Sequence, residues 1–404
     1  MAEKRALELR RLFLLKPGLV FLNHGSFGAC PKPVMEAYQA WQLELEGQPV
    51  EFLARRFVSL MSRARQQLAA YVACRRDDLV FTPNATTALN AVARSLPLQP
   101  GDEVLSTNHE YGAIDRTWRF VCELRRARYV QQPIPLPVTS RQEVIETIWS
   151  GVTENTRVLS VSHVTSPTAL ILPIETLIDR ARERRIITVV DGAHAPGQLP
   201  INLHRLGADF YAGNCHKWMC APKGSAFLYA RPKAQPLLQP LVVSWGWHSD
   251  HPSASRFVDE QEWQGTRDIA AYLSVPTAIT FLEQHRWEGV RQHCHELASL
   301  ARQQITRLTG LAPVQPDSSD WYAQMVTLPL PLCNERALQK ALHDRFGIEV
   351  PVSRWHDRSL LRVSVQGYNT RKDIDALTQG LADLLPAFCI DPRPIPRPLD
   401  WGGG

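Results

Sequence analysis

The chain has 404 residues, of which 44% are hydrophobic and 21% are charged, and its formal net charge is +5. This length is sufficient for two domains with separate cores, and the composition is typical of a globular enzyme. Acidic and basic residues are intermixed and no apolar stretch approaches 18 residues, so neither a nucleic-acid-binding surface nor a membrane span is expected.

The N-terminal residues carry acidic side chains and lack the apolar segment of a secretory signal. The eight cysteines are scattered without a Cys-x-x-Cys pair, which indicates reduced thiols. We therefore expect a cytoplasmic protein. His293 and His295 lie on a polar helical stretch without further ligands at helical spacing, so no metal site is predicted.

Short apolar runs alternate with amphipathic stretches between about residues 79 and 230. The runs predict strands at 79–81, 103–107, 129–130, 157–162, 186–190, 209–211 and 225–229. Strands that alternate with helices favour an α/β fold with a mainly parallel sheet. In such a sheet, ligands bind at the carboxyl ends of the strands.

After about residue 256 the pattern changes to longer helices and fewer strands. A helical region over 268–309 precedes a strand at 324–328, a helix at 334–346, a strand at 360–365 and a helix at 371–386. This order predicts a smaller α+β domain. We place an N-terminal segment that packs near the small domain at 1–20, the large domain at 21–255, the small domain at 256–389 and a Pro-rich tail at 390–404.

Two apolar runs of the predicted sheet end in side chains suited to pyridoxal phosphate chemistry. Asp191 follows the run 186–190, and Lys217 follows the run 209–211 within a segment that ends in Pro-Lys-Gly. A lysine can hold the aldehyde of this cofactor as a Schiff base, and an aspartate can keep its pyridine nitrogen protonated. Each residue alone would fit a surface lysine or a helix cap, but the ordered pair predicts the cofactor.

A phosphate site is predicted where a helix begins after the run 79–81. By itself this segment is better explained by an N-cap at Asn84 or Thr86. With the aspartate and lysine downstream, the free N–H groups of a helix N-terminus favour phosphate binding instead. Asn214 and His216, beside the lysine, would add two donors.

Aromatic and polar side chains follow three further strands. Tyr111 or His109 could stack on the pyridine ring. His163 and His194 could bind the phenolic oxygen of the cofactor or the substrate. Arg362 is flanked by apolar residues and is costly to bury unless a carboxylate pairs with it. Either a bidentate contact to a substrate carboxylate or a structural ion pair would satisfy it.

These motifs together resemble the class V aminotransferase-fold enzymes, which depend on pyridoxal phosphate, and within them the isopenicillin N epimerase-like branch. The resemblance covers nearly the whole chain and implies a fold-type I homodimer with the active site at the subunit interface. It rests on the segments Asn23-His-Gly-Ser-Phe-Gly28, Asn84-Ala-Thr-Thr-Ala-Leu-Asn90, His109-Glu-Tyr-Gly112, Ser162-His-Val-Thr-Ser-Pro-Thr168, Asp191-Gly-Ala-His194, His216-Lys-Trp218, Gly265-Thr-Arg-Asp268 and Arg362-Val-Ser with Tyr368-Asn-Thr370.

The resemblance also implies a role for each matching residue. Lys217 would form the Schiff base, Asp191 would pair with the pyridine nitrogen, Tyr111 would stack on the ring and His194 would lie near the phenolic oxygen. The residues implied in phosphate binding are Ala85, Thr86, Asn214, His216 and, from the neighbouring subunit, Thr266. The residues implied in substrate binding are Asn23, His24 and Ser26 at the entrance and Arg362 at the carboxylate.

Two departures distinguish the chain from the cysteine desulfurases of this class. The loop 350–358 before Arg362 contains no cysteine nucleophile, and Ser166 stands where those enzymes have an asparagine beside the cofactor oxygen. A desulfurase is therefore disfavoured.

Three reactions remain open after Lys217 removes the Cα proton. We expect an epimerase first, which needs a second acid from His109, Tyr111 or a water. A C–S β-lyase and an aminotransferase are the alternatives. A non-catalytic protein that only binds the cofactor is disfavoured, because Lys217, Asp191 and Arg362 are all present.

Overall fold

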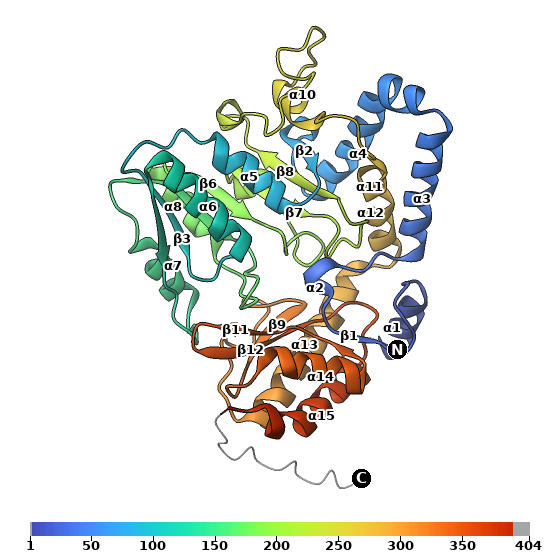
Figure 1. The fold of residues 1–404 in the computed structure, drawn as a ribbon, viewed down its shortest axis with the longest axis vertical. Coiled ribbons are helices and arrows are strands. Elements are labelled where there is room, and N and C mark those ends of the chain that lie inside the picture. The colour runs from blue at the N-terminus through green and yellow to red at the C-terminus, as the bar shows by residue number, and fades with distance from the viewer. Residues whose placement is uncertain (1, 391–404) are drawn as a thin grey trace.

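The computed structural model describes residues 2–390 (Figure 1). Its largest element is a seven-stranded sheet of order β2-β8-β7-β6-β5-β3-β4, in which β8 runs antiparallel to both neighbours and the remaining pairings are parallel. The strands are β2 (Leu79–Thr82), β3 (Glu103–Thr107), β4 (Arg128–Gln132), β5 (Thr156–Ser162), β6 (Ile187–Asp191), β7 (Phe210–Asn214) and β8 (Ala226–Ala230). The predicted mainly parallel α/β sheet is confirmed.

Helices cover both faces of this sheet because alternate strand residues point to opposite sides. Val104, Val158, Val189 and Phe210 pack with α5 (Ala85–Ser95) and α6 (Gly112–Arg125) in one buried cluster. Leu105, Leu159, Val190 and Tyr211 join the other cluster with α7 (Arg141–Trp149) and α8 (Ile174–Glu183). The continuous apolar runs of the sequence therefore fill two cores, one on each side of the sheet.

The C-terminal part forms a separate α+β layer, which lies below the large sheet in Figure 1. Its antiparallel sheet has the order β11-β12-β9. The elements are α13 (Trp287–Thr309), β9 (Met325–Leu330), α14 (Glu335–Phe346), β10 (Ile348–Glu349), β11 (Val352–Trp355), β12 (Arg358–Ser364) and α15 (Arg371–Phe388). Strand β12 carries Arg362 towards the large sheet, so this layer contributes to the site described below.

The helical region predicted as one stretch over 268–309 is interrupted. It comprises α11 (Ala270–Leu273), α12 (Val275–Gln284) and α13, and Arg286 between the last two has a φ of +46°. A left-handed residue ends the run of helical hydrogen bonds, and the periodicity of the apolar residues does not reveal such a break. The loop expected at 350–358 is likewise a hairpin between β11 and β12, with His356 at φ +51° in its turn.

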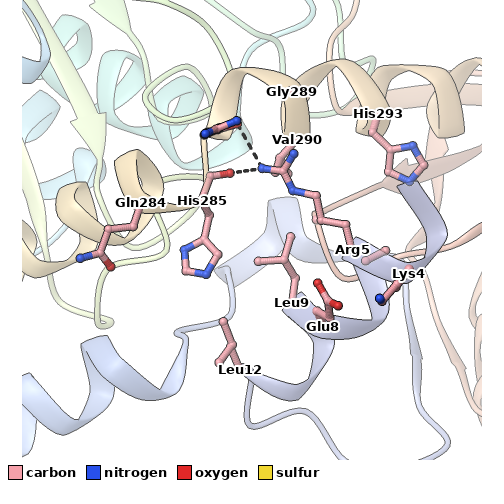
Figure 2. A pocket seen from close by; sticks show the side chains of 13 residues that line it. Lys4, Arg5, Glu8, Leu9, Leu12, Gln284, His285, Gly289, Val290 and His293 are labelled. Carbon is pink, nitrogen blue, oxygen red and sulfur yellow. Dashed lines mark hydrogen bonds between the residues drawn. The ribbon is translucent and has the colours of Figure 1, made fainter. Parts of the chain in front are cut away.

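The N-terminal elements connect the two parts of the molecule. Helix α1 (Ala2–Arg11) leads to β1 (Val20–Phe21), which pairs with β10 of the C-terminal layer, and then to α2 (His24–Phe27). Arg5 anchors α1 by donating to the carbonyl oxygens of His285 and Arg286 at the interruption between α12 and α13. Figure 2 shows the contact with His285.

The remaining helices surround the sheet. They are α3 (Lys32–Gly47), a π-helix (Glu51–Arg55), α4 (Phe57–Tyr71), α9 (Leu203–Leu206), α10 (Arg256–Glu262) and two 3₁₀ turns (Arg76–Asp78 and Gln235–Leu237). None of the helices within residues 2–390 has the length and apolar character required to cross a membrane. The tail predicted at 390–404 lies outside the described residues except for Ile390.

Candidate active site

A cavity of about 440 Å³ lies at the carboxyl ends of β5, β6 and β7. The sheet brings these strand ends together, and α2 and β12 add residues from the two ends of the chain. The predicted site residues that line the cavity are Ser26, Ala85, Thr86, Tyr111, Ser166, Asp191, His194, Asn214, His216, Lys217 and Arg362. Segments up to 336 residues apart in the sequence therefore form a single site.

Lys217 and His194 are in direct contact within the cavity. The Nζ atom of Lys217 lies 3.2 Å from Nε2 of His194, and Nε1 of Trp218 donates to Nδ1 of His194 at 3.3 Å. Because an indole N–H can only donate, a neutral His194 carries its proton on Nε2, facing the lysine. Burial lowers the pKa of His194 well below its usual value. This tautomer favours the unprotonated amine of Lys217, which can accept the hydrogen bond.

The electrostatic environment also favours a neutral lysine. Burial and the nearby charge of Arg362 lower the pKa of Lys217 to about 8, while Asp191 acts in the opposite direction. Asp191 is 6% exposed, and its carboxylate accepts a hydrogen bond from the N–H of Ala193 at 2.9 Å. Burial raises the pKa of Asp191, and this carboxylate has no ion-pair partner among residues 2–390. A cationic group entering the cavity would provide that partner.

The N-terminus of α5 faces the same cavity. Asn84 caps the helix through Thr87, whose N–H it accepts at 2.8 Å, and Oδ1 of Asn214 accepts the N–H of Ala85 at 2.9 Å. The amide nitrogen of Asn214 is thereby left to face outwards as a donor, and the N–H of Thr86 has no acceptor in the described residues. These donors at a helix N-terminus fit a phosphate group.

His216 also lines this part of the cavity, but it presents an acceptor instead of the expected donor. Its Nδ1 lies 2.9 Å from the carbonyl oxygen of Ser225, which can only accept, so Nδ1 carries the proton when the ring is neutral. Burial lowers the pKa of His216 to about 4. The ring is therefore neutral near pH 7 and presents an unprotonated Nε2, which can bind the protonated form of a phosphate oxygen or a bridging water.

Arg362 has no carboxylate partner in the part of the chain that the structure describes. Its Nη1 donates to the carbonyl oxygen of Ser166 at 2.8 Å and its Nη2 donates to Oγ of Ser26 at 3.0 Å. Its Nε is buried without a hydrogen-bond partner. Burial lowers the pKa of Arg362 to about 10, so the side chain is a cation at pH 7 that lacks a counter-ion. The alternative of a structural ion pair is therefore not observed for this arginine.

The two aromatic candidates for ring stacking occupy different places. Tyr111 is 48% exposed and lines the cavity. His109 is fully buried, with Nδ1 2.7 Å from Oγ1 of Thr168 and Nε2 2.9 Å from the carbonyl oxygen of Ile134, and it does not line the cavity. Of these two candidates, Tyr111 therefore lies at the site and His109 does not.

Four predicted site residues lie outside the cavity wall. His163 points away from it and contacts the hydroxyl of Tyr211 at 3.0 Å, because the alternation of strand residues directs His163 opposite to its neighbour Ser162. Asn23 and His24 are 8% and 0% exposed and contact protein groups behind the cavity. Thr266 is exposed and is not among the residues that line the cavity of its own chain.

Several lining residues were not predicted from the sequence. Ser162 and Val164 flank His163, Ala193 follows Asp191 by two residues, and Phe27 is 73% exposed at the cavity. Ser162 could have been identified from the sequence. It pairs in register with Asp191 on the neighbouring strand, and paired residues point to the same side of a sheet. His163 was chosen as a candidate because its side chain is polar, although that side chain points away from the cavity.

A second cavity of about 520 Å³ adjoins the first and shares Tyr111, Ser166 and Arg362 with it. The β11–β12 hairpin forms one wall, with the ring of Trp355 packed 4.7 Å from that of His109. The other residues lining this cavity include the polar side chains of Asn108, Gln131, Asp115, Arg354 and His356. A ligand bound at Arg362 could therefore extend into this polar cavity.

Comparison with known proteins agrees with this geometry. Residues 20–377 match the family "Aminotransferase class-V". The isopenicillin N epimerase of Amycolatopsis lactamdurans is 37% identical over 385 residues, which cover 92% of this chain and 96% of that protein. A probable chloroplastic L-cysteine desulfhydrase of Arabidopsis thaliana is 27% identical over 409 residues, covering 91% and 83%.

A solved structure shares the fold. It is a variant of C-DES with glycine covalently linked to its pyridoxal phosphate cofactor. The two structures superimpose with a TM-score of 0.81 at 22% sequence identity, and the match covers 93% of this chain and 99% of that chain.

Proposed function

Since this chain belongs to the class V aminotransferase family and is a pyridoxal-phosphate-dependent enzyme, we propose that it epimerises the α-carbon of an amino acid, with C–S bond cleavage as the alternative. The observation that carries the proposal is the convergence of Lys217, Asp191 and Arg362 on one cavity. Proton abstraction next to a carboxylate requires an amine of lowered pKa, an unpaired carboxylate and an unpaired guanidinium.

The donor and acceptor groups of the cavity fit pyridoxal phosphate. The N–H of Thr86 and the amide nitrogen of Asn214 would hold the phosphate, and Asp191 would accept from the protonated pyridine nitrogen. We propose that Tyr111 covers one face of the ring and that Ser166 and His194 lie at the phenolic oxygen. When bound, the cofactor supplies an electron sink for charge that develops at the substrate α-carbon.

We propose that Lys217 acts as the base. Its pKa of about 8 leaves an appreciable fraction of unprotonated amine at neutral pH, whereas an ordinary lysine would be almost fully protonated. Arg362 would bind the substrate carboxylate through charge-assisted hydrogen bonds that no carboxylate within residues 2–390 takes. The substrate α-carbon would thus be held between an anchored carboxylate and the amine of Lys217.

The adjoining polar cavity favours epimerisation of an extended amino acid over cleavage of cysteine. Cysteine has a side chain of one carbon and one sulfur, which needs no second cavity, whereas a long polar side chain could extend past Arg362 towards Gln131 and His356. Identity is also higher with the epimerase than with the desulfhydrase. For the second proton transfer we propose Tyr111 or a water beside it, because His109 lies outside the cavity.

The reaction class can be tested with a panel of L-amino acids in deuterated water, including L-cysteine and amino acids with long amide-containing side chains. An epimerase introduces deuterium at Cα and forms the D-isomer, a lyase releases pyruvate from cysteine, and an aminotransferase forms a keto acid with pyridoxamine phosphate. We expect Cα deuteration with inversion, strongest for the extended substrates.

The control for this panel is Lys217→Ala, which keeps the cavity but lacks the base and should show no exchange. Absence of Cα exchange with every substrate in wild-type protein that contains the cofactor would overturn the proposal. Pyruvate release without the D-isomer would establish the lyase instead.

We further propose that the protein is a cytoplasmic homodimer in which Thr266 reaches the phosphate of the neighbouring subunit. The exposed position of Thr266, outside the cavity of its own chain, supports this arrangement.

A further inference from the structure

The buried pair His24 and Tyr368 lies directly behind Lys217 and has no part in the chemistry proposed above. His24 is 0% exposed and Tyr368 is 2% exposed. Nδ1 of His24 lies 2.8 Å from the hydroxyl oxygen of Tyr368, and Nε2 lies 3.0 Å from the backbone carbonyl oxygen of Lys217. The imidazole thus connects a tyrosine of the C-terminal layer to the backbone of the reactive lysine.

The hydrogen bonds around His24 determine its tautomer. The carbonyl oxygen of Lys217 can only accept, and the hydroxyl hydrogen of Tyr368 has no acceptor other than Nδ1 in the described residues. The amide nitrogen of Gln366 lies 3.1 Å from Nε2 and also 3.7 Å from Sγ of Cys220, to which it can donate instead. The hydroxyl of Tyr368 and the carbonyl oxygen of Lys217 are both satisfied when Tyr368 donates to Nδ1 and Nε2–H donates to Lys217.

The imidazole stays neutral near pH 7, because burial lowers the pKa of His24 to about 3.

The residues around His24 are closely packed. The ring centroid lies 5.2 Å from that of Trp218, and a Cβ added at Gly28 would lie 2.0 Å from the carbonyl oxygen of His216. The segment that carries His24 therefore packs directly against the backbone that presents Lys217.

Helix α1 supports this pair from the far side. Phe13, just after the helix, packs edge-on against Tyr368 with ring centroids 4.8 Å apart, and the guanidinium of Arg10 lies 5.8 Å from the same ring centroid. Figure 2 shows α1 docked on the start of α13 through Arg5, with Leu9 and Leu12 facing the same groove. Contacts from α1 thus continue through Tyr368 and His24 to Lys217.

We propose that His24 is a positioning residue for Lys217, held by Tyr368 in the tautomer that donates to the Lys217 carbonyl oxygen. The proposal rests on the proposed function in one respect, because it takes Lys217 to be the reactive lysine. Nζ of Lys217 has to remain 3.2 Å from His194 in a buried environment for the pKa of its amine to stay lowered. A backbone released from His24 would let the amine move towards water, where its pKa rises and its reactivity at neutral pH falls.

The test uses cofactor-free full-length protein, in which the reactivity of Lys217 is measured by competitive labelling with an amine reagent across pH. The exposed Lys233 serves as the internal reference. We expect Tyr368→Phe to reduce labelling of Lys217 at pH 7 about fivefold, which corresponds to the loss of one ordinary hydrogen bond. His24→Ala should reduce it further, and His24→Gln should restore part of it, because its amide can donate from near the Nε2 position.

The matched control is Tyr322→Phe. Tyr322 is also fully buried, and its hydroxyl donates to Asp317, away from the cavity. Tyr322→Phe should lower the melting temperature by about as much as Tyr368→Phe does, and it should leave the labelling of Lys217 unchanged. Tyr368→Phe removes a single oxygen and keeps the ring, so the test does not depend on whether His24→Ala folds.

Two outcomes would overturn the positioning role. One is unchanged labelling of Lys217 in both Tyr368→Phe and His24→Ala, and the other is an equal reduction in Tyr322→Phe. Failure of the proposed function would show differently, as wild-type protein that binds no pyridoxal phosphate or exchanges no Cα proton, since the labelling experiment requires neither.

Discussion

Arg362 and Asp191 shift the pKa of Lys217 in opposite directions. Burial is the largest cause of its lowered pKa, the charge of Arg362 lowers the pKa further, and Asp191 raises it. Because Arg362 has no counter-ion among the described residues, its full charge acts on the lysine until a substrate carboxylate binds. The residue proposed to bind the substrate therefore also helps to prepare the base.

Substitution of Arg362 should separate these two roles. Arg362→Gln removes the charge, so we expect the pKa of Lys217 to rise above about 8 in cofactor-free protein, measured by pH-dependent amine labelling. It should also raise the KM for the amino acid by about 10- to 100-fold through the lost charge-assisted bonds. Arg362→Lys keeps the charge but not the planar fork, and should raise the KM with little change in the pKa. Equal pKa values in all three proteins would contradict the electrostatic role.

At the scale of elements, the start of α5 combines a structural cap with the proposed phosphate site. Asn84 accepts the N–H of Thr87, as helix N-caps commonly do, while the N–H of Thr86 beside it is left for a ligand in the cavity. The cap and the phosphate site were competing interpretations of this segment from the sequence, and both are compatible with the structure. They are compatible because a cap uses only one of the free N–H groups.

The helix α14 offers a matched control for the cap. Its N-cap is also an asparagine, Asn334, which accepts the N–H of Ala337 at 3.1 Å and lies far from the cavity. Asn84→Ala and Asn334→Ala should each lower the free energy of unfolding by about 1 kcal/mol. Only Asn84→Ala should weaken the binding of pyridoxal phosphate, measured by absorbance titration. A similar loss of affinity in both variants would argue against a phosphate site at α5.

For the whole molecule, the exposed apolar side chains support the proposed homodimer. Val243, Trp245 and Trp247 are 66%, 82% and 49% exposed on the segment between β8 and α10, which projects from the body of the molecule in Figure 1. Exposed apolar groups of this size commonly mark an interface. The same region leads to Thr266, for which we proposed a contact across the dimer.

Mixing two inactive variants tests this arrangement. Lys217→Ala lacks the base, and Thr266→Glu would place a negative charge against the phosphate. In a mixed dimer, one site has both an intact Lys217 and an intact Thr266, so refolding equal amounts together should restore activity to about one quarter of the wild-type sites. Sedimentation should show dimers in each case. Failure of dimeric mixtures to recover activity would contradict a shared site.

Much of the fold and of the site could be predicted from the sequence for a physical reason. In a parallel sheet, the carboxyl ends of neighbouring strands meet at one edge, so residues that follow apolar runs, such as Asp191 and Asn214, lie close together wherever the sheet forms. The placement of Lys217 in the same cavity follows from its position just after β7. Local patterns determine these features, and no contact distant in sequence is needed to infer them.

Only the tertiary structure decided how side chains outside this pattern are directed. His109 is buried beside Trp355 and His24 lies behind Lys217, although both were candidates for the site. Their directions depend on the packing of α2 and the C-terminal layer against the large sheet, which residue spacing does not encode. The sequence by itself therefore determined the cofactor class and the place of Lys217 at the cavity, whereas the groups proposed to position this lysine and the room for a substrate depend on long-range packing.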